Sequence, residues 1–179
     1  MNIIYFDLET TGLSITRDRI VEIGFIYNDK PHTLRLNPTI PISKEASRVH
    51  NIYDNDVVDC KTFKDISIKL YNIFESADII IGYNSDVFDI PFLEVEFLRC
   101  GLVLTPKPTL DIFKLWKHLE PDQKLSTCYR RFVGKELKDA HSAEADIEGT
   151  KICLDKIMDM YNLSLSDSVF YSYNYKKKY

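Results

Sequence analysis

Hydrophobic residues form short β-branched and aromatic runs near the N-terminus and fall at helical spacing further along the chain. Segments 2–7, 19–27 and 32–36 predict three strands, and Asn28, Asp29 and Lys30 supply turn chemistry between the last two. This pattern is typical of an antiparallel meander. Segment 78–83 is nearly all apolar, which is typical of a central strand covered on both faces.

Apolar residues at helical spacing predict helices over 62–75, about 111–119, about 124–132 and about 143–161. A short helix is expected around Glu45–Val49, and another begins near Pro91, where proline is tolerated. Strands first, followed by alternating strands and helices, predict an α/β fold. We expect a mixed central sheet of about five strands flanked by helices.

A length of 179 residues suits one domain with a full core. We expect this domain to span residues 1–161, followed by a loosely ordered C-terminal tail over 162–179. The aromatic and basic end of that tail could also contact nucleic acid or a partner. The N-terminus does not resemble a signal peptide, and no segment reaches the ~18 apolar residues of a membrane span.

The four cysteines stand singly, with no CxxC pair. This pattern argues against a structural zinc site and against a secreted disulfide framework, and it indicates a cytoplasmic protein. The formal net charge of −4 argues against a generic nucleic-acid coat protein. Residues 124–138 form a local basic run, which is either a guide for a nucleic-acid strand or a solvated helix face. Its cations are Lys124, Arg130, Arg131, Lys135 and Lys138, against one acid, Glu136.

Two carboxylates stand one residue apart at the end of the first predicted strand, in the stretch FDLETTG over residues 6–12. Asp7 and Glu9 share a face because successive strand residues point to opposite sides. Like charges held side by side near a buried sheet are costly without a counter-charge. The pair alone is compatible with a solvated strand end or with a divalent metal site.

Three further residues are candidates for the same chemistry. Asp146 falls inside the apolar stripe of the predicted helix 143–161, which favours a position facing the sheet over a surface position. Asp89 follows the apolar strand and precedes Pro91, where it is either a helix cap or a site residue beyond a strand end. His141 precedes the last helix and is either a proton carrier or a helix-entry residue without a role.

Taken together, FDLETTGL, GYNSDVFDIPFL and AHSAEAD resemble the three motifs of the DEDDh family of 3′→5′ exonucleases. That family belongs to the ribonuclease H-like superfamily and contains the proofreading ε subunit of bacterial replicative DNA polymerase. The order and spacing match, and the likeness covers about residues 2–160. The sister family has a tyrosine where this chain has Ser142, so the histidine version is favoured.

The resemblance implies a ribonuclease H-like fold and a set of site residues. The catalytic set is Asp7, Glu9, Asp89, His141 and Asp146. Its four carboxylates would hold two divalent ions, Mg²⁺ or Mn²⁺, and His141 would be the general base. Asp86 is the alternative to Asp89 in the second motif. The implied substrate contacts are Thr10, Thr11, Gly12, Leu13, Asn84 and Phe88, and His50 is either near the same pocket or a packing residue.

The implied reaction is metal-dependent hydrolysis at the 3′ end of single-stranded or frayed DNA, releasing nucleoside 5′-monophosphates. The expected partners are single-stranded 3′ ends, with DNA favoured over RNA, and a polymerase or another replication or repair protein; no membrane is expected. The alternatives are an exoribonuclease acting on short RNA or RNA 3′ ends, an endonuclease on the same fold, and a non-catalytic module that binds nucleic acid or a polymerase. Two divalent ions would cancel the formal charge of the chain.

Overall fold

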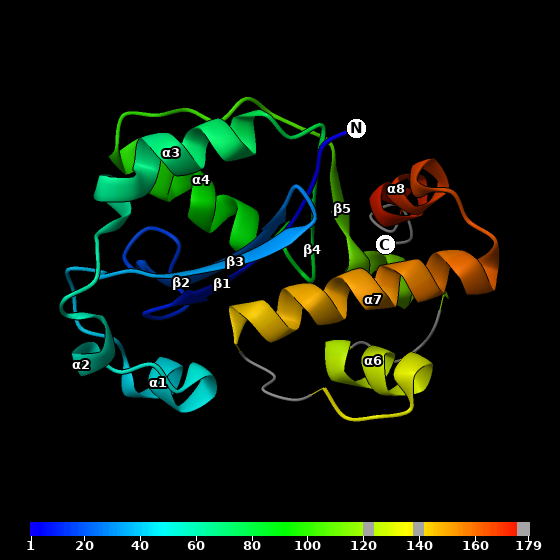
Figure 1. The fold of residues 1–179 in the computed structure, drawn as a ribbon, viewed down its shortest axis with the longest axis horizontal. Helices are drawn as coiled ribbons and strands as arrows, with labels where there is room; N and C mark the ends of the chain where they lie inside the picture. The colour runs from blue at the N-terminus through cyan, green and yellow to red at the C-terminus, as the bar shows by residue number, and fades with distance from the viewer. Residues whose placement is uncertain (120–123, 138–141, 175–179) are drawn as a thin grey trace.

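Five strands form one mixed sheet in the order β3-β2-β1-β4-β5 (Figure 1). The structure is a computed structural model that describes residues 1–119, 124–137 and 142–174. The strands are β1 (Ile3–Thr10), β2 (Ile20–Tyr27), β3 (Lys30–Arg35), β4 (Ile79–Gly82) and β5 (Thr109–Asp111). Antiparallel pairing joins the first three strands, whereas β4 runs parallel to β1 and β5. The predicted meander and mixed α/β sheet are confirmed.

Helices cover both faces of the sheet (Figure 1). One face carries α3 (Phe63–Glu75) and α4 (Asp89–Arg99). The other carries α5 (Ile112–Leu119), α6 (Leu125–Val133), α7 (Ala143–Tyr161) and α8 (Leu165–Asn174). Two short helices, α1 (Lys44–His50) and α2 (Asp54–Val57), lie at one end of the molecule. Among the described residues, none of the helices has both the length and the apolar character that crossing a membrane requires.

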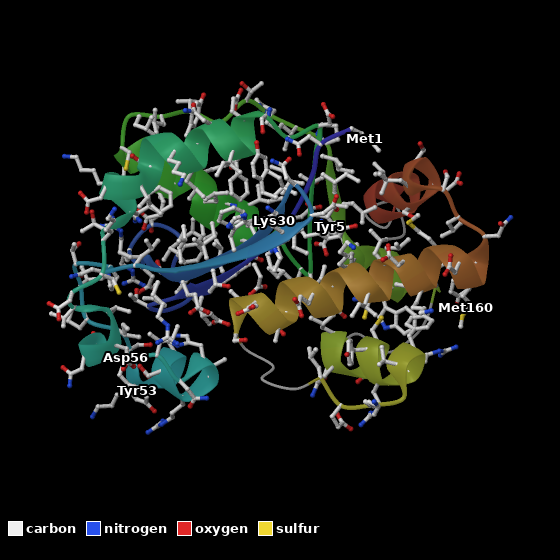
Figure 2. All side chains as sticks on the ribbon, viewed as in Figure 1. Met1, Tyr5, Lys30, Tyr53, Asp56 and Met160 are labelled. Atoms are coloured by element: carbon white, nitrogen blue, oxygen red, sulfur yellow. The ribbon has the colours of Figure 1, made fainter. Side chains whose placement is uncertain are left out.

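The strict alternation of β1 divides the core into two layers. Ile4, Phe6 and Leu8 pack toward α3 and α4, whereas Tyr5 belongs to the core beneath α7. Side chains fill both layers of the core, and Tyr5 projects from the sheet among them (Figure 2). Asp7 and Glu9 alternate with Phe6 and Leu8 along the strand, so their carboxylates lie on the face covered by α7.

Three differences between the structure and the sequence prediction concern the site, the sheet and the C-terminal segment. β1 continues to Thr10, past the expected end at residue 7, so Glu9 as well as Asp7 lies within the strand. β5 was not located in the sequence, because it has only three residues and follows Pro106 and Pro108 closely. The third difference lies in the segment expected to be a tail.

Residues 165–174 form α8 where a loosely ordered tail was expected. Ser164 and Asp167 cap its start reciprocally, with Ser164 N donating to Asp167 at 2.9 Å and Asp167 N donating to Ser164 Oγ at 3.1 Å. Leu165 and Val169 then pack against the core beneath α7. This apolar burial orders the segment. Residues 175–179 lie outside the described residues, and a domain boundary at residue 161 stays a prediction.

Candidate active site

Three carboxylates from two distant segments meet between β1 and the start of α7. Asp7 and Glu9 project from the α7 face of β1, and Asp146 lies in the first turn of α7. Ser142 caps that helix, its Oγ accepting the N–H of Ala145 at 3.3 Å. One oxygen atom from each of the three carboxylates lies within 4.8 Å of the others. Hard divalent cations such as Mg²⁺ prefer oxygen ligands, so these three carboxylates are the residues that could hold one.

Asp89 lies beside this group, at the edge of β1, and is not one of the three residues whose oxygens lie within 4.8 Å of one another. β4 pairs with β1 only as far as Tyr5, so the edge of β1 beyond that point has no parallel partner strand. The Asp89 carboxylate occupies that edge, where its Oδ1 accepts the N–H of Leu8 at 3.0 Å. The side chain is buried at the start of α4. The second motif is thereby attached to the strand that carries the first.

The electrostatics of the group indicate a site that needs positive charge. Burial raises the pKa of Glu9 to about 8, and the negative charges of Asp146, Glu22 and Asp89 add to the effect. Burial likewise raises the pKa of Asp89 to about 7. The pKa of Asp7 lies well above its usual range, because its carboxyl group is largely desolvated and the negative charges of Asp89, Asp146 and Glu9 are close. A divalent cation would reverse these shifts by stabilising the ionised carboxylates, so the residues present fit such an ion.

Asp86, the alternative to Asp89, forms its contacts away from the carboxylate cluster. Its carboxylate forms an ion pair with the buried ammonium of Lys114 and accepts the hydroxyl of Thr109 at 2.8 Å. Lys114 also lies 3.7 Å from the fully buried Asp111. These contacts hold Asp86 at the ends of β4 and β5, and the geometry favours Asp89 as the second-motif ligand.

The loop after β1 borders a cavity of ≈ 670 Å³ that reaches from Glu9 to α1. This volume lies within the range of about 300–1,000 Å³ that is usual for small-molecule sites. Of the predicted substrate contacts, Thr10, Gly12, Leu13 and Phe88 line the cavity. Leu13 is 84% exposed, which leaves an apolar side chain available to a ligand.

The two other predicted contacts hold loops in place. The Thr11 hydroxyl donates to Asp18 at 3.0 Å and accepts the N–H of Arg19 at 3.1 Å. Asn84 adopts a left-handed backbone with φ of 60° and donates its N–H to Asp111 at 2.9 Å. Their described bonds therefore support the walls of the site, while the residues beside them face the cavity.

His50 combines the two roles that the sequence left open. It lines the cavity and is itself buried. Its Nδ1 accepts the N–H of Ile52 at 3.0 Å, which assigns the proton to Nε2, and Nε2 lies 3.2 Å from the carbonyl oxygen of Thr10. Burial lowers the pKa of His50, consistent with a neutral ring. His50 thus fixes the backbone immediately after Glu9.

His141 and Lys138 lie outside the described residues, so the general base and part of the basic run stay predictions. Two other cations of the run have partners within the chain. Arg130 forms a 3.1 Å ion pair with Glu136, and the guanidinium of Arg131 lies 5.6 Å from the centre of the Trp116 ring.

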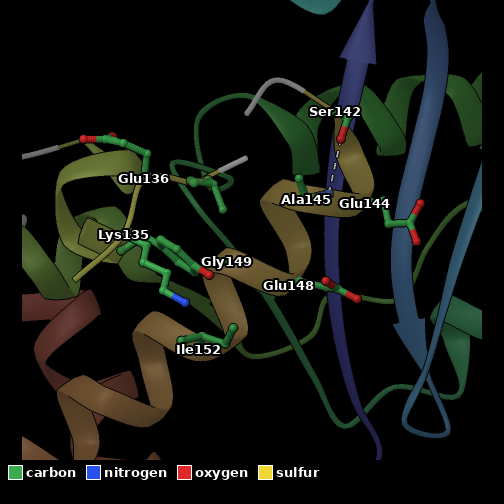
Figure 3. Close-up of a pocket in the computed structure, with 10 residues that line it drawn as sticks. Lys135, Glu136, Ser142, Glu144, Ala145, Glu148, Gly149 and Ile152 are labelled. Atoms are coloured by element: carbon green, nitrogen blue, oxygen red, sulfur yellow. Dashed lines mark hydrogen bonds between the residues drawn. The ribbon is translucent and has the colours of Figure 1, made fainter. Parts of the chain in front are cut away.

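A second hollow of ≈ 380 Å³ lies between the end of α6 and the first half of α7 (Figure 3). Its charged lining residues are Lys135 and three acids, Glu136, Glu144 and Glu148. A surface in which acids outnumber bases is poorly suited to a phosphate backbone. The described part of the basic run therefore offers little support for a strand-guiding role.

Glu22 is a further acid beside the site that was not predicted from the sequence; it is buried and lies opposite Glu9 in the pairing of β1 with β2. The signal was present: one acid within the otherwise apolar strand segment IVEIGFIY. Such an acid needs a partner, and Glu22 forms a 3.0 Å ion pair with Arg35.

Relatives of known sequence match this chain over only a small part of their own length. The chain is 30% identical over 155 residues to the DNA polymerase III PolC-type of Pediococcus pentosaceus, a match that covers 82% of the chain and 11% of the relative. The corresponding protein of Lacticaseibacillus paracasei is also 30% identical over 155 residues, with 10% of its length covered. The chain thus spans about a tenth of the length of these curated relatives.

Solved structures share the fold. Exonuclease I of E. coli in complex with a dT13 oligonucleotide superposes with a TM-score of 0.77 at 18% identity, covering 88% of this chain and 41% of that one. Exonuclease X in complex with 5′ overhanging duplex DNA has a TM-score of 0.69 at 21% identity, and the match covers 95% of this chain and 99% of that one. The predicted ribonuclease H-like fold is confirmed.

The family model RNase_T, described as "Exonuclease", matches residues 4–152. That range contains β1, α4 and the first half of α7, and with them every carboxylate of the cluster. The predicted relationship is confirmed, and the chain belongs to this exonuclease family.

Proposed function

We propose that this protein is a metal-dependent 3′→5′ exonuclease that shortens single-stranded or frayed DNA ends and releases nucleoside 5′-monophosphates. The observation that carries the proposal is the approach of Asp7, Glu9 and Asp146 to within 4.8 Å of one another beside a nucleotide-sized cavity. The raised pKa values of Glu9 and Asp89 support it, because they reflect crowded and partly desolvated negative charge that a bound cation would compensate.

Asp7, Glu9, Asp89 and Asp146 would hold two divalent cations, Mg²⁺ or Mn²⁺. When bound, such ions activate a water molecule and neutralise charge on the attacking and leaving oxygens. The water oxygen would bond to the terminal phosphorus while the bond from phosphorus to the preceding 3′ oxygen breaks. His141 would take the proton of the water, and the terminal nucleotide would leave as a 5′-monophosphate.

The cavity beside Glu9 would hold the terminal nucleotide. Leu13 and Phe88 offer apolar surface to a base, and the hydrogen bond from His50 to Thr10 keeps the intervening loop in place. A terminal nucleotide fits this arrangement because Glu9 itself lines the cavity, and the 3′ polarity is proposed from the resemblance of the three motifs.

DNA is the proposed substrate because the curated relatives are DNA polymerases and because exonuclease I and exonuclease X were solved with DNA. A polymerase or another replication or repair protein would supply frayed ends to the chain. The matching region in the relatives is a small part of a much longer polymerase, which supports such a partnership.

The test uses 5′-labelled single-stranded, blunt and 3′-recessed oligonucleotides in DNA and RNA versions. We expect a ladder that shortens from the 3′ end, fastest on single-stranded DNA, and nucleoside 5′-monophosphates as products. Immediate release of a labelled mononucleotide would reverse the polarity, and internal fragments would indicate an endonuclease. Faster shortening of RNA would make the enzyme an exoribonuclease, and no cleavage by folded, metal-bound protein would indicate a binding module.

A further inference from the structure

Glu22 is a buried acid in the middle of β2, between the fully buried side chains of Val21 and Ile23. Only 4% of the residue is exposed. A carboxylate in such surroundings is costly unless it is hydrogen-bonded and paired. Its position directly across from Glu9 adds repulsion to that cost. Its contacts indicate what offsets this cost.

Each oxygen of Glu22 has a different partner. Oε2 accepts Nε–H of Arg35 on β3 at 3.0 Å. Oε1 accepts the backbone N–H of Ala143 at 3.2 Å. Ala143 is the first residue of α7, where the N–H groups have no partner inside the helix and where negative charge is favourable. Glu22 therefore ties the start of α7 to the central sheet.

Gly24, the next residue of β2 on the same face, brings the two elements into direct contact. A Cβ atom at this position would lie 2.8 Å from the backbone carbon and oxygen of Ala143. The start of α7 thus rests on the strand at Gly24 and is bonded to it through Glu22. Asp146 follows within the first turn, its N–H donating to the carbonyl of Ser142 at 3.0 Å.

We propose that Glu22 is a positioning residue of the active site: by holding Ala143 it sets Asp146 at the distance from Asp7 and Glu9 that a divalent cation requires. This inference rests on the proposed function, because it assigns a cation to those carboxylates. Arg35 balances the charge of Glu22 and leaves the other oxygen free for Ala143. Glu22 acts through α7 and makes no contact with substrate.

The substitutions at this position separate positioning from charge. Glu22→Gln keeps an oxygen that can accept from Ala143 but loses the charge. Glu22→Asp keeps the charge but is one methylene too short to reach Ala143. Glu22→Ala loses both. Glu94→Ala on the exposed side of α4 is the matched control.

Calorimetric titration of nucleic-acid-free protein with Mn²⁺ is the primary measurement. We expect Glu22→Ala and Glu22→Asp to bind Mn²⁺ about 10–100-fold more weakly than the wild type, which is usual when the support of a ligand is lost. Glu22→Gln and Glu94→Ala should bind within a few-fold of the wild type. In turnover assays the weakened variants should lose kcat at saturating Mn²⁺ while KM for the oligonucleotide stays the same.

Two results would overturn the inference. Glu22→Asp binding as the wild type while Glu22→Gln is impaired would mean that charge, not position, matters. Unaltered Mn²⁺ binding in Glu22→Asp and Glu22→Ala, with only a lower melting temperature, would make Glu22 a purely structural residue. A wild type that binds no Mn²⁺ and cleaves nothing would instead overturn the proposed function. Because Glu22→Asp and Glu22→Gln are conservative, the comparison survives even if Glu22→Ala does not fold.

Discussion

Glu9 is an acid of the carboxylate cluster whose ionisation lowers the stability of the folded, metal-free protein. Its pKa of about 8 in the folded protein exceeds the ordinary value of 4.5. Between these two pH values the folded, metal-free protein binds more protons than the unfolded chain. The free energy of unfolding therefore falls as the pH rises through this window. The stabilising contribution of the protonated group is fully present below pH 4.5 and is lost toward pH 8.

The Glu9→Gln variant should accordingly melt several degrees above the wild type at pH 8 in EDTA, because glutamine cannot ionise. At pH 5 the two proteins should melt at nearly the same temperature. Each kcal/mol shifts the melting temperature of a chain of this size by about 2–4 °C, so the difference is measurable by calorimetry. The control variant Glu94→Gln retains Glu9 and should melt at the wild-type temperature at both pH values. Equal melting curves for Glu9→Gln and the wild type at pH 8 would mean that the pKa of Glu9 is not raised in the folded protein.

His141 is assigned through its place in the third motif, and its prediction concerns rate alone. His141→Ala should lower single-turnover cleavage by about 10²–10⁴-fold, which is the usual contribution of a general base. Mn²⁺ binding should persist, because the four carboxylates are intact. A variant that cleaves at the wild-type rate would refute the assignment of His141 as the base.

At the scale of elements, Lys114 of α5 anchors the loop between β4 and α4 through its ion pair with Asp86. Its ammonium is shared by Asp86 and Asp111, and all three side chains are largely shielded from water. Asp111 also accepts the N–H groups of Asn84 and Phe113. This network determines where the second motif leaves β4 and thus where Asp89 begins α4.

Lys114→Met should destabilise the protein by about 3–5 kcal/mol, because it leaves two buried carboxylates without their cation. Urea denaturation would measure the loss, with the exposed Lys69→Met as the control.

Asp89→Asn should affect turnover and not stability: the protein should fold as the wild type does and cleave little DNA. If Asp86→Asn abolished turnover and Asp89→Asn did not, the second-motif ligand would have to be moved to Asp86.

The same scale shows what could be predicted from the sequence. The period of β1 and the apolar stripe of α7 are local signals, and they correctly put Asp7 and Glu9 on one face of the strand and Asp146 on the side of the helix that faces the sheet. That these two surfaces meet was implied only by the family resemblance. The short β5 and the helix α8 could not be recognised locally, because their order comes from pairing with β4 and packing against the core beneath α7. The partners of Glu22 lie 13 and 121 residues away, so its role is visible only in three dimensions.

At the scale of the molecule, the topology assembles the site. Parallel pairing puts β4 beside β1, so the second motif emerges next to the first. α7 crosses the face of the sheet opposite to α3 and α4, and it carries Asp146 of the third motif to the same place (Figure 1). Three segments that are far apart in the sequence thus converge around a single strand, which explains why the spacing of the motifs identified the family.

The most direct test of the account is cleavage of a 5′-labelled single-stranded DNA by EDTA-stripped protein, with Mg²⁺ or Mn²⁺ added back and Asp7→Asn measured in parallel. We predict no cleavage without metal, 3′-shortening ladders in the wild type on adding either ion, and no ladder from Asp7→Asn at any metal concentration, although circular dichroism shows it folded. Cleavage in EDTA, or an active Asp7→Asn protein, would contradict the assignment of the carboxylate cluster as a metal-dependent catalytic centre.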